Sequence, residues 1–269
     1  MPRLEEMELA VSVGNRARDY ESSVEKFNRM EKLPYFDQVR YAMGIAYNAE
    51  EAGAGKEVMF IGGIGVLGNL VYNLGTDIIP RWRGTKDVDL SLKRRDLTFV
   101  TDDVFDYLEE SSFRSLSVKN KLNTRGHSHD LNGVDLIEAS IDCYCPDNGE
   151  DSFFIQNTLV SPETWDCLVE SDFFGIPLRA APISLLLDLK VGISCSQTSR
   201  PRDRDCEDIL NLLGLAEIRD ILPGELKFYL NYNKIDCLKR IVEYSSTRSS
   251  EFKHLLVEPS FIYRRYLLE

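Results

Sequence analysis

The chain contains few of the side chains that build metal centres and disulfide frameworks. Its 269 residues include 3 histidines and 6 cysteines, and no two cysteines form a CxxC pair. In a chain of this length we therefore expect reduced thiols rather than disulfides or zinc ligands. The stretches CYC at 143–145 and HSH at 127–129 would each turn both metal-binding side chains to one side of a strand, so they stay as weak metal candidates.

Long hydrophobic runs, repeats and low-complexity segments are also missing. No apolar stretch approaches the roughly 20 residues that a membrane-spanning helix needs. The opening sequence, MPRLEEMELAV, is acidic and lacks the basic region that begins a signal peptide. These absences predict a cytoplasmic protein without a membrane partner. Hydrophobic residues make up 43% of the chain, which is enough for a sizeable core, so we expect a globular fold.

The chain has too little positive charge for a surface that binds nucleic acid over its whole extent, since its formal net charge is −12. Its cations are nevertheless concentrated near one motif. Six lie close together in the sequence: Arg81, Arg83, Lys86, Lys93, Arg94 and Arg95. They indicate either a local anion-binding site or basic loops exposed to solvent, and the sequence leaves both readings open.

The spacing of apolar residues predicts an α+β fold. The expected elements, in order, are helices over 5–32 and 36–53, a strand at 57–63, a helix after its two glycines, a strand at 86–92, a helix from 101, three strands between 113 and 160, a strand at 174–180 and helices from Pro182 onward. The simplest architecture is a mixed sheet with flanking helices, followed by a C-terminal helical region. We place the boundaries at 1–55 for an N-terminal helical segment, 56–180 for the α/β core and 181–269 for the C-terminal helical domain.

The sequence RGTKDVDL, residues 83–90, holds two carboxylates side by side. Asp87 and Asp89 alternate with apolar residues, so both carboxylates are expected on one face of a strand. Such a pair suits two Mg²⁺ or Mn²⁺ ions, which prefer oxygen ligands and act together in phosphoryl and nucleotidyl transfer. The alternative is an edge strand on which the two aspartates merely face solvent.

A third carboxylate usually completes such a metal site. The later strand VDLIEASIDCY offers Asp135, Glu138 and Asp142, and Asp135 falls on its more apolar face. An antiparallel neighbour would bring the end of this strand beside the start of the strand at 86–92. We therefore predict Asp142 as the third metal ligand and as a catalytic residue.

Gly62, Gly63 and Gly65 separate a predicted strand from a predicted helix. Because glycine has no side chain, backbone N–H groups at the start of that helix could approach a phosphate closely. The P-loop pattern GxxxxGK[ST] is absent. GGIGVLG does match GxGxxG, which keeps an NAD-binding oxidoreductase as a minor alternative, although paired aspartates within a strand suit that fold poorly.

Gly62-Gly63, followed by Arg83, Thr85 and DVDL, resembles the signature of the nucleotidyltransferase superfamily, which shares the polymerase-beta-like fold. IPLRAAPISLLLDLKVG and RPRDRDCEDILNLL resemble the later motifs of the AbiEii-type nucleotidyltransferases, the toxins of bacterial abortive-infection and toxin–antitoxin systems. The resemblance covers about residues 57–213. It implies a nucleotidyltransferase-fold mixed sheet, a nucleoside triphosphate substrate, Mg²⁺ or Mn²⁺ as cofactor and an antitoxin protein as a partner.

The same resemblance assigns roles to individual residues. It implies metal ligation by Asp87 and Asp89, and catalytic roles for Lys190 and Asp205. It places six residues at the nucleotide: Gly62, Gly63, Arg83, Thr85, Arg204 and Asp208. One departure is that the family often carries Ser or Thr shortly after the glycines, whereas Ile64 and Gly65 follow here.

Two of these assignments have simpler structural alternatives. Lys190 lies in the apolar stretch LLLDLKVG, so its ammonium must either reach solvent or find an anion. Arg204 and Asp208 are spaced for an i,i+4 ion pair on a helix surface. Each residue thus has a structural reading beside the functional one.

The sequence therefore predicts a cytoplasmic, metal-dependent nucleotidyltransferase. It would move a nucleoside monophosphate from an NTP to an acceptor hydroxyl on RNA such as tRNA, on a protein or on a small molecule. The rival from another class is a non-catalytic nucleotide-binding relative that acts as a regulatory or interaction module. Metal-dependent NTP binding without turnover would distinguish that rival.

Overall fold

The structure is a computed structural model of the whole chain. It describes residues 36–101, 113–119, 123–129, 135–146, 150–155, 157–196, 201–220, 232–248, 252, 255–256, 259–262 and 264, and for the strands between 113 and 142 it describes the backbone alone. The helix predicted over 5–32 and most of the helix predicted from 101 lie outside these residues.

Seven strands form a mixed sheet in the order β3-β4-β5-β2-β1-β9-β8. The strands are β1 (Val58–Phe60), β2 (Asp87–Leu92), β3 (Phe113–Lys119), β4 (Asn123–His129), β5 (Asp135–Tyr144), β8 (Val169–Phe173) and β9 (Ile176–Ala180). β1 pairs antiparallel with β2 and parallel with β9, while β2 pairs parallel with β5. A separate hairpin is formed by β6 (Phe153–Ile155) and β7 (Thr158–Val160).

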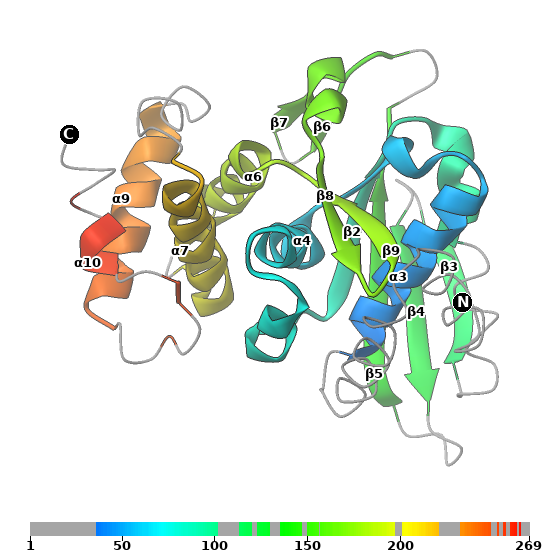
Figure 1. The fold of residues 1–269 in the computed structure, drawn as a ribbon, viewed down its shortest axis with the longest axis horizontal. Helices are drawn as coiled ribbons and strands as arrows, with labels where there is room; N and C mark the ends of the chain where they lie inside the picture. The colour runs from blue at the N-terminus through cyan, green and yellow to red at the C-terminus, as the bar shows by residue number, and fades with distance from the viewer. Residues whose placement is uncertain are drawn as a thin grey trace.

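Helices cover the sheet and continue beyond it. They are α3 (Phe36–Glu51), α4 (Gly62–Leu74), α6 (Ile183–Ser196), α7 (Asp203–Ile218), α9 (Tyr232–Ser246) and the short α10 (Pro259–Ile262). α4 and α3 pack on opposite sides of the central strands, and the later helices gather beyond α4 (Figure 1). The predicted α+β fold, with a mixed sheet followed by a helical region, is confirmed. None of the described helices has the length and apolar character of a membrane span.

The sequence of α4 explains its central position. The predicted apolar stripe is buried at Val66, Leu67, Leu70 and Val71, whereas Leu74, at the end of the helix, is 39% exposed. At Gly68 an added β-carbon would lie 2.7 Å from the β-carbon of Ala180. The missing side chain therefore lets α4 approach β9 closely, which holds the N-terminus of α4 near the end of β1.

Two short hairpins were missed by the sequence patterns. The single strand expected over 152–160 is the β6–β7 hairpin, whose turn contains Asn157 at a φ of 68°. β8 and β9 form a second hairpin around Phe174 and Gly175, which also have positive φ values. In both hairpins a residue in the left-handed region reverses the chain. The sequence pattern predicts one continuous strand for the first hairpin, and it leaves β8 of the second hairpin unassigned.

The pairing of β2 with β5 is parallel, so the antiparallel arrangement assumed for Asp142 is wrong. β5 follows the antiparallel strands β3 and β4, which occupy the outer part of the sheet. The 20 or so residues between β2 and β3 are enough for the crossover that a parallel arrangement requires. The register nevertheless pairs Asp89 with Asp142 and Asp87 with Ser140.

Candidate functional site

The antiparallel pairing of β1 and β2 brings the glycines and the aspartates to one end of the sheet. Phe60 lies opposite Leu90, and the N–H of Ile61 donates to the carbonyl of Asp89 at 2.9 Å. The turn that begins α4 therefore lies beside the start of β2. The glycines and the aspartates are more than twenty positions apart in the sequence. They meet because the end of β1 lies beside the beginning of β2.

Gly62 is required at this meeting point by both conformation and space. It has a φ of 58°, and a β-carbon added there would overlap the carboxylate of Asp89. At Gly63 a β-carbon would lie 2.8 Å from Thr85 Oγ1. The glycine backbone therefore packs directly against the side chains at the start of β2, an arrangement that any larger residue would push apart.

We expect the substitution Gly62→Ala to disrupt the site, whereas Gly53→Ala should be tolerated. Both glycines have positive φ values, so each substitution carries a backbone cost of about 1–2 kcal/mol. A β-carbon at Gly53 meets no heavy atom within 4 Å, whereas one at Gly62 displaces Asp89. Thermal unfolding and Mg²⁺-dependent NTP binding of the two variants measure the difference. Equal NTP binding in both variants would contradict a role for the contact between Gly62 and Asp89.

Asp87 and Asp89 lie on one face of β2, as the alternation predicts, and both are half-buried. The hydroxyl of Thr85 donates to Oδ1 of Asp87 at 2.7 Å, which fixes the orientation of that carboxylate. The two aspartates do not simply face bulk solvent on an edge strand, because β2 lies inside the sheet between β5 and β1. Both side chains open into a cavity.

The cavity has a volume of about 240 Å³ and lies between the sheet and the helices that follow it. It combines the predicted phosphate-binding glycines, both aspartates and four cations. Its lining residues are Ile61, Gly62, Gly63, Arg83, Thr85, Asp87, Asp89, Tyr144, Ile155, Leu186, Leu189, Lys190, Ile193, Arg202, Arg204 and Asp205. Ten of the eleven residues predicted for the site are described with their side chains, and nine of these line this cavity. The exception is Asp208.

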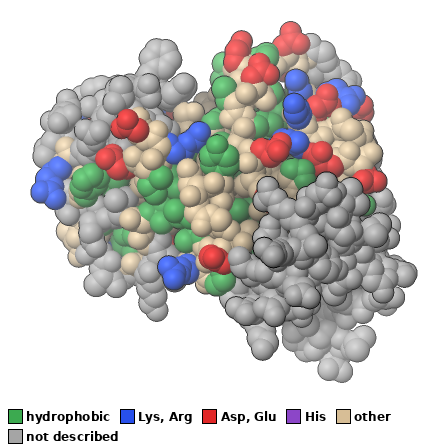
Figure 2. All heavy atoms as spheres, viewed as in Figure 1, with side chains coloured by type: hydrophobic (Ala, Val, Ile, Leu, Met, Phe, Trp, Pro, Cys, Tyr) green, Lys and Arg blue, Asp and Glu red, His purple; other side chains and the backbone are tan. Residues whose placement is uncertain are grey.

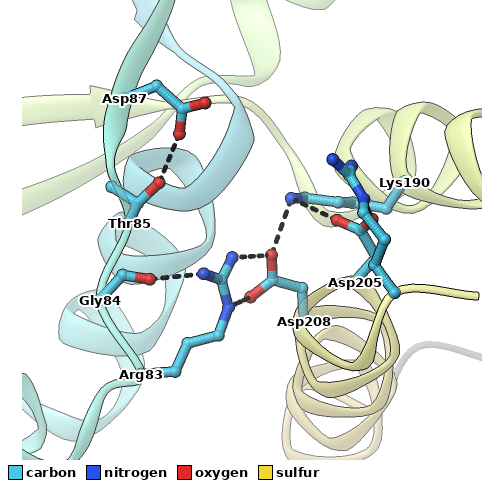
Figure 3. A network of polar contacts seen from close by, with 8 residues as sticks. Arg83, Gly84, Thr85, Asp87, Lys190, Asp205 and Asp208 are labelled. Atoms are coloured by element: carbon cyan, nitrogen blue, oxygen red, sulfur yellow. Dashed lines mark hydrogen bonds and ion pairs between the residues drawn. The ribbon is translucent and has the colours of Figure 1, made fainter. Parts of the chain in front are cut away.

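Asp208 lies behind the cavity and holds two of its cations (Figure 3). Arg83 Nε donates to Oδ1 at 2.8 Å, and Arg83 Nη2 bonds Oδ2 to complete a bidentate pair. Lys190 Nζ lies 2.8 Å from the same Oδ2. Both cations are at most 11% exposed, and the carboxylate is 1% exposed. Asp208 therefore positions Arg83 and Lys190 rather than contacting a molecule in the cavity.

Asp205 extends this network toward the surface. Its Oδ1 accepts a bond of 3.3 Å from Lys190, and its Oδ2 accepts a bond of 2.5 Å from Arg202 Nε. Lys190 is thus held between two carboxylates of α7, so the alternative in which it reaches solvent is wrong. Two buried carboxylates and three cations leave this network with one excess positive charge beside the cavity.

The alternative in which Arg204 and Asp208 form a surface ion pair is also wrong. Both oxygens of Asp208 bond Arg83 and Lys190, whereas Arg204 is exposed at the cavity mouth. A helix wheel places Arg204 and Asp208 close together, but it carries no information about cations from other parts of the chain. Arg83 lies 125 positions away from Asp208 in the sequence.

The electrostatics of the network favour the ionised carboxylate. Burial alone would raise the pKa of Asp208, but the charges of Lys190 and Arg83 and the hydrogen bonds that they donate outweigh it, so this pKa lies below its ordinary value. The next residue behaves differently. Burial raises the pKa of Glu207 despite the nearby charge of Arg83. Attraction to the cations therefore outweighs burial at Asp208 but not at Glu207.

The donor set at the start of β2 fits a divalent cation. Carboxylate oxygens in a half-buried cavity are ligands that Mg²⁺ and Mn²⁺ prefer, and Asp87 and Asp89 both line the cavity. Asp142 is paired with Asp89 in the sheet register, although its side chain lies outside the described part of the structure. Among the described side chains, no group of three His, Cys, Asp or Glu residues could hold a metal.

The other metal candidates gain no support as sites. None of the six cysteines is part of a disulfide, and Cys143 is buried. The backbone of HSH lies in β4, and its side chains are outside the described part of the chain.

Sequence reasoning assigned no role to seven residues of the cavity lining. They are Ile61, Tyr144, Ile155, Leu186, Leu189, Ile193 and Arg202. A signal existed for the helical ones, because Leu189 and Ile193 are spaced about Lys190 so that all three share one helix face. Tyr144 and Ile155 are brought in by strands whose positions depend on the tertiary fold.

No protein-family model matches the chain, and no curated protein matches it in sequence. Solved structures that are similar to it include two nucleotidyltransferase-like proteins. An antigenic nucleotidyltransferase-like protein from Paracoccidioides brasiliensis is 15% identical, with a TM-score of 0.42 over 84% of this chain and 97% of that chain. A candidate nucleotidyltransferase from H. pylori is 13% identical, with a TM-score of 0.41 over 82% of both chains.

The molecular surface agrees with the acidic composition. On the face shown in Figure 2, basic side chains are scattered among acidic and apolar ones, and the described residues form no continuous basic surface there. Positive charge is instead concentrated in the cavity, where Arg83, Lys190, Arg202 and Arg204 converge. These four cations can meet an anionic ligand in the cavity.

Proposed function

We propose that this protein is a metal-dependent nucleotidyltransferase that takes a nucleoside triphosphate as its substrate. The observation that carries the proposal is the convergence of paired carboxylates, close-packed glycine backbone and cations in one cavity. Asp87 and Asp89 would hold Mg²⁺ or Mn²⁺. The cations Arg83, Lys190 and Arg202 would balance the charge of the phosphates. A purely apolar ligand would leave the charged groups of this lining without partners.

The reaction proposed is an in-line displacement at the α-phosphate. The acceptor hydroxyl forms a new bond to this phosphorus, and the bond to the β-phosphate oxygen breaks as pyrophosphate leaves. Bound Mg²⁺ would lower the charge on the phosphate oxygens and favour ionisation of the acceptor. The protein would orient the triphosphate through Gly62, Gly63 and Thr85, and it would hold the cations in place through Asp205 and Asp208.

We expect Asp142→Asn to reduce the transfer rate by about a hundredfold or more while it changes NTP binding little. The register places Asp142 beside Asp89, where a carboxylate could accept the proton of the acceptor hydroxyl. Single-turnover rates and equilibrium NTP binding separate the two effects. Glu138→Gln is the control, since Glu138 lies farther back along β5. Full activity in Asp142→Asn together with loss in Glu138→Gln would transfer the role to Glu138.

A non-catalytic nucleotide-binding module remains the second candidate. Arg83 and Lys190 are already bound by Asp208, and Ile64 and Gly65 stand where related enzymes often carry a hydroxyl. This candidate predicts metal-dependent NTP binding without release of pyrophosphate. Measuring both quantities on the same preparation, with and without Mg²⁺, distinguishes it from the enzyme.

The acceptor of the proposed reaction is an RNA such as tRNA, a protein hydroxyl or a small molecule. Incubation with labelled NTPs and total cellular RNA or protein shows which class becomes labelled.

A role as the toxin of a toxin–antitoxin or abortive-infection system is a further part of the proposal. It predicts that expression of the protein arrests growth, that the arrest requires Asp89, and that a co-expressed antitoxin protein relieves it.

A further inference from the structure

One part of the cavity lining is apolar, and none of its residues was assigned a role from the sequence motifs. We call it the apolar wall, and it consists of Tyr144, Ile155, Leu186, Leu189 and Ile193. Three of these residues lie on α6 together with Lys190, at spacings that place them on one face of the helix. The same helix face therefore presents a cation and an apolar surface to a single cavity.

The apolar wall keeps part of its surface accessible. Ile155 and Leu189 are buried, whereas Tyr144 and Ile193 are half-buried. Accessible apolar side chains inside a cavity that also contains charged groups are typical of a ligand site with two chemically different ends. A nucleotide has these two ends, because its phosphates are anionic and its base is flat and largely apolar on both faces.

The position of the wall is fixed by a polar cluster behind it. Thr158 in β7 donates a hydrogen bond of 2.6 Å to Oδ2 of Asp188 in α6, and Lys234 in α9 lies 2.6 Å from the same oxygen. These contacts tie the β6–β7 hairpin, which carries Ile155, to the helix that carries Leu189 and Ile193. Four of the five wall residues, all except Tyr144, therefore lie on elements that these contacts join.

We propose that the apolar wall holds the nucleobase of the nucleoside triphosphate, and that it discriminates weakly among the four bases. This inference rests on the function proposed above. Asn and Gln side chains, which read base edges with a donor and an acceptor together, are missing from the described lining of the cavity. Within the wall, the hydroxyl of Tyr144 is the sole side-chain group that can form a hydrogen bond.

The expected selectivity follows from this composition. A site that recognises a substrate by hydrogen bonds rejects a mismatched analogue by about 10⁴-fold or more, whereas apolar contact alone discriminates by about 10–200-fold. Base stacking on an aromatic ring tolerates every base, since each base has a π face. The wall should thus increase the affinity for all four nucleotides to a similar degree.

The test is equilibrium binding of ATP, GTP, CTP, UTP and tripolyphosphate to the full chain, with Mg²⁺ and without an acceptor. We expect the four nucleotides to bind within about tenfold of one another and at least about tenfold more tightly than tripolyphosphate. Tyr144→Ala and Ile193→Ala should weaken all four nucleotides by about tenfold and leave tripolyphosphate binding unchanged. Tyr144→Phe, which keeps the ring, should retain the nucleotide affinity. Thermal unfolding verifies that each variant is folded.

Two results would overturn the assignment of the wall while leaving the proposed function intact. One is preference for a single base by about a hundredfold or more, which would show that hydrogen bonds read the base. The other is equal binding of nucleotides and tripolyphosphate, unaffected by the wall variants, which would place the base outside the wall. If neither nucleotides nor tripolyphosphate bind with Mg²⁺ present, the proposed function and the wall assignment are both wrong.

Discussion

Replacing either Asp87 or Asp89 by asparagine should abolish Mg²⁺-dependent NTP turnover, with a loss of about a thousandfold or more. Both carboxylates open into the cavity, and the contact of Asp89 with Gly62 leaves no space for another side chain to take its place. Asparagine preserves the shape of each side chain but removes the negative charge that a divalent cation needs. Both variants should remain folded, because the two aspartates are only half-buried.

The measurement compares turnover and thermal unfolding of the two variants with those of Asp166→Asn. Asp166 is an exposed aspartate of η5 (Pro162–Cys167), outside the cavity lining, so it controls for the loss of one charge. Turnover at the wild-type rate in Asp87→Asn or Asp89→Asn would rule out the metal assignment for that residue.

Asp208→Asn should be the most destabilising substitution in the ion network, at about 3–5 kcal/mol, because it leaves Arg83 and Lys190 buried without their shared counter-ion. For a chain of this size the melting temperature should fall by about 10 °C.

Lys190→Met should lower the free energy of unfolding by less than Asp208→Asn does. In that variant Asp208 keeps Arg83 and Asp205 keeps Arg202, so the remaining charges balance.

The pH dependence of this effect has a defined sign. The pKa of Asp208 is lower in the folded protein than its ordinary value of 3.8, so its contribution to stability is complete above that value. The contribution begins to decline below 3.8 and is lost as the pH falls through the lower pKa of the folded protein. The difference in unfolding free energy between wild type and Asp208→Asn should therefore be constant near neutral pH and shrink below about pH 4. A difference that stays constant to pH 3 would show that the ionised carboxylate is not what stabilises the network.

Local patterns were enough to predict the elements that carry the site. The alternation in β2 predicts that its two aspartates share one face of the strand, and the apolar stripe of α4 predicts which side of that helix is buried. The structure agrees with both predictions. The glycines at the start of α4 reflect a local conformational requirement, since Gly62 adopts a positive φ. These features depend on neighbours in the sequence, which is why they could be read from it.

The remaining features depend on residues that are distant in the sequence. Arg83 reaches Asp208 because α7 packs near α4 and the start of β2, and no local pattern encodes that contact. The parallel pairing of β2 with β5 follows from the position of β3 and β4 at the sheet edge. β8 was missed because Ser171, a polar residue, occupies a buried position there and bonds the carbonyl of Leu178.

The central claim is that this chain transfers the α-phosphoryl group of a nucleotide together with its nucleoside. The most direct test incubates the wild-type protein and Asp89→Asn with Mg²⁺, cellular acceptors and NTPs that are labelled at either the α- or the γ-phosphate. We predict that the α label becomes covalently attached to an acceptor, that the γ label appears in pyrophosphate, and that Asp89→Asn does neither. Attachment of the γ label, or transfer of the α label that is undiminished in Asp89→Asn, would contradict the account.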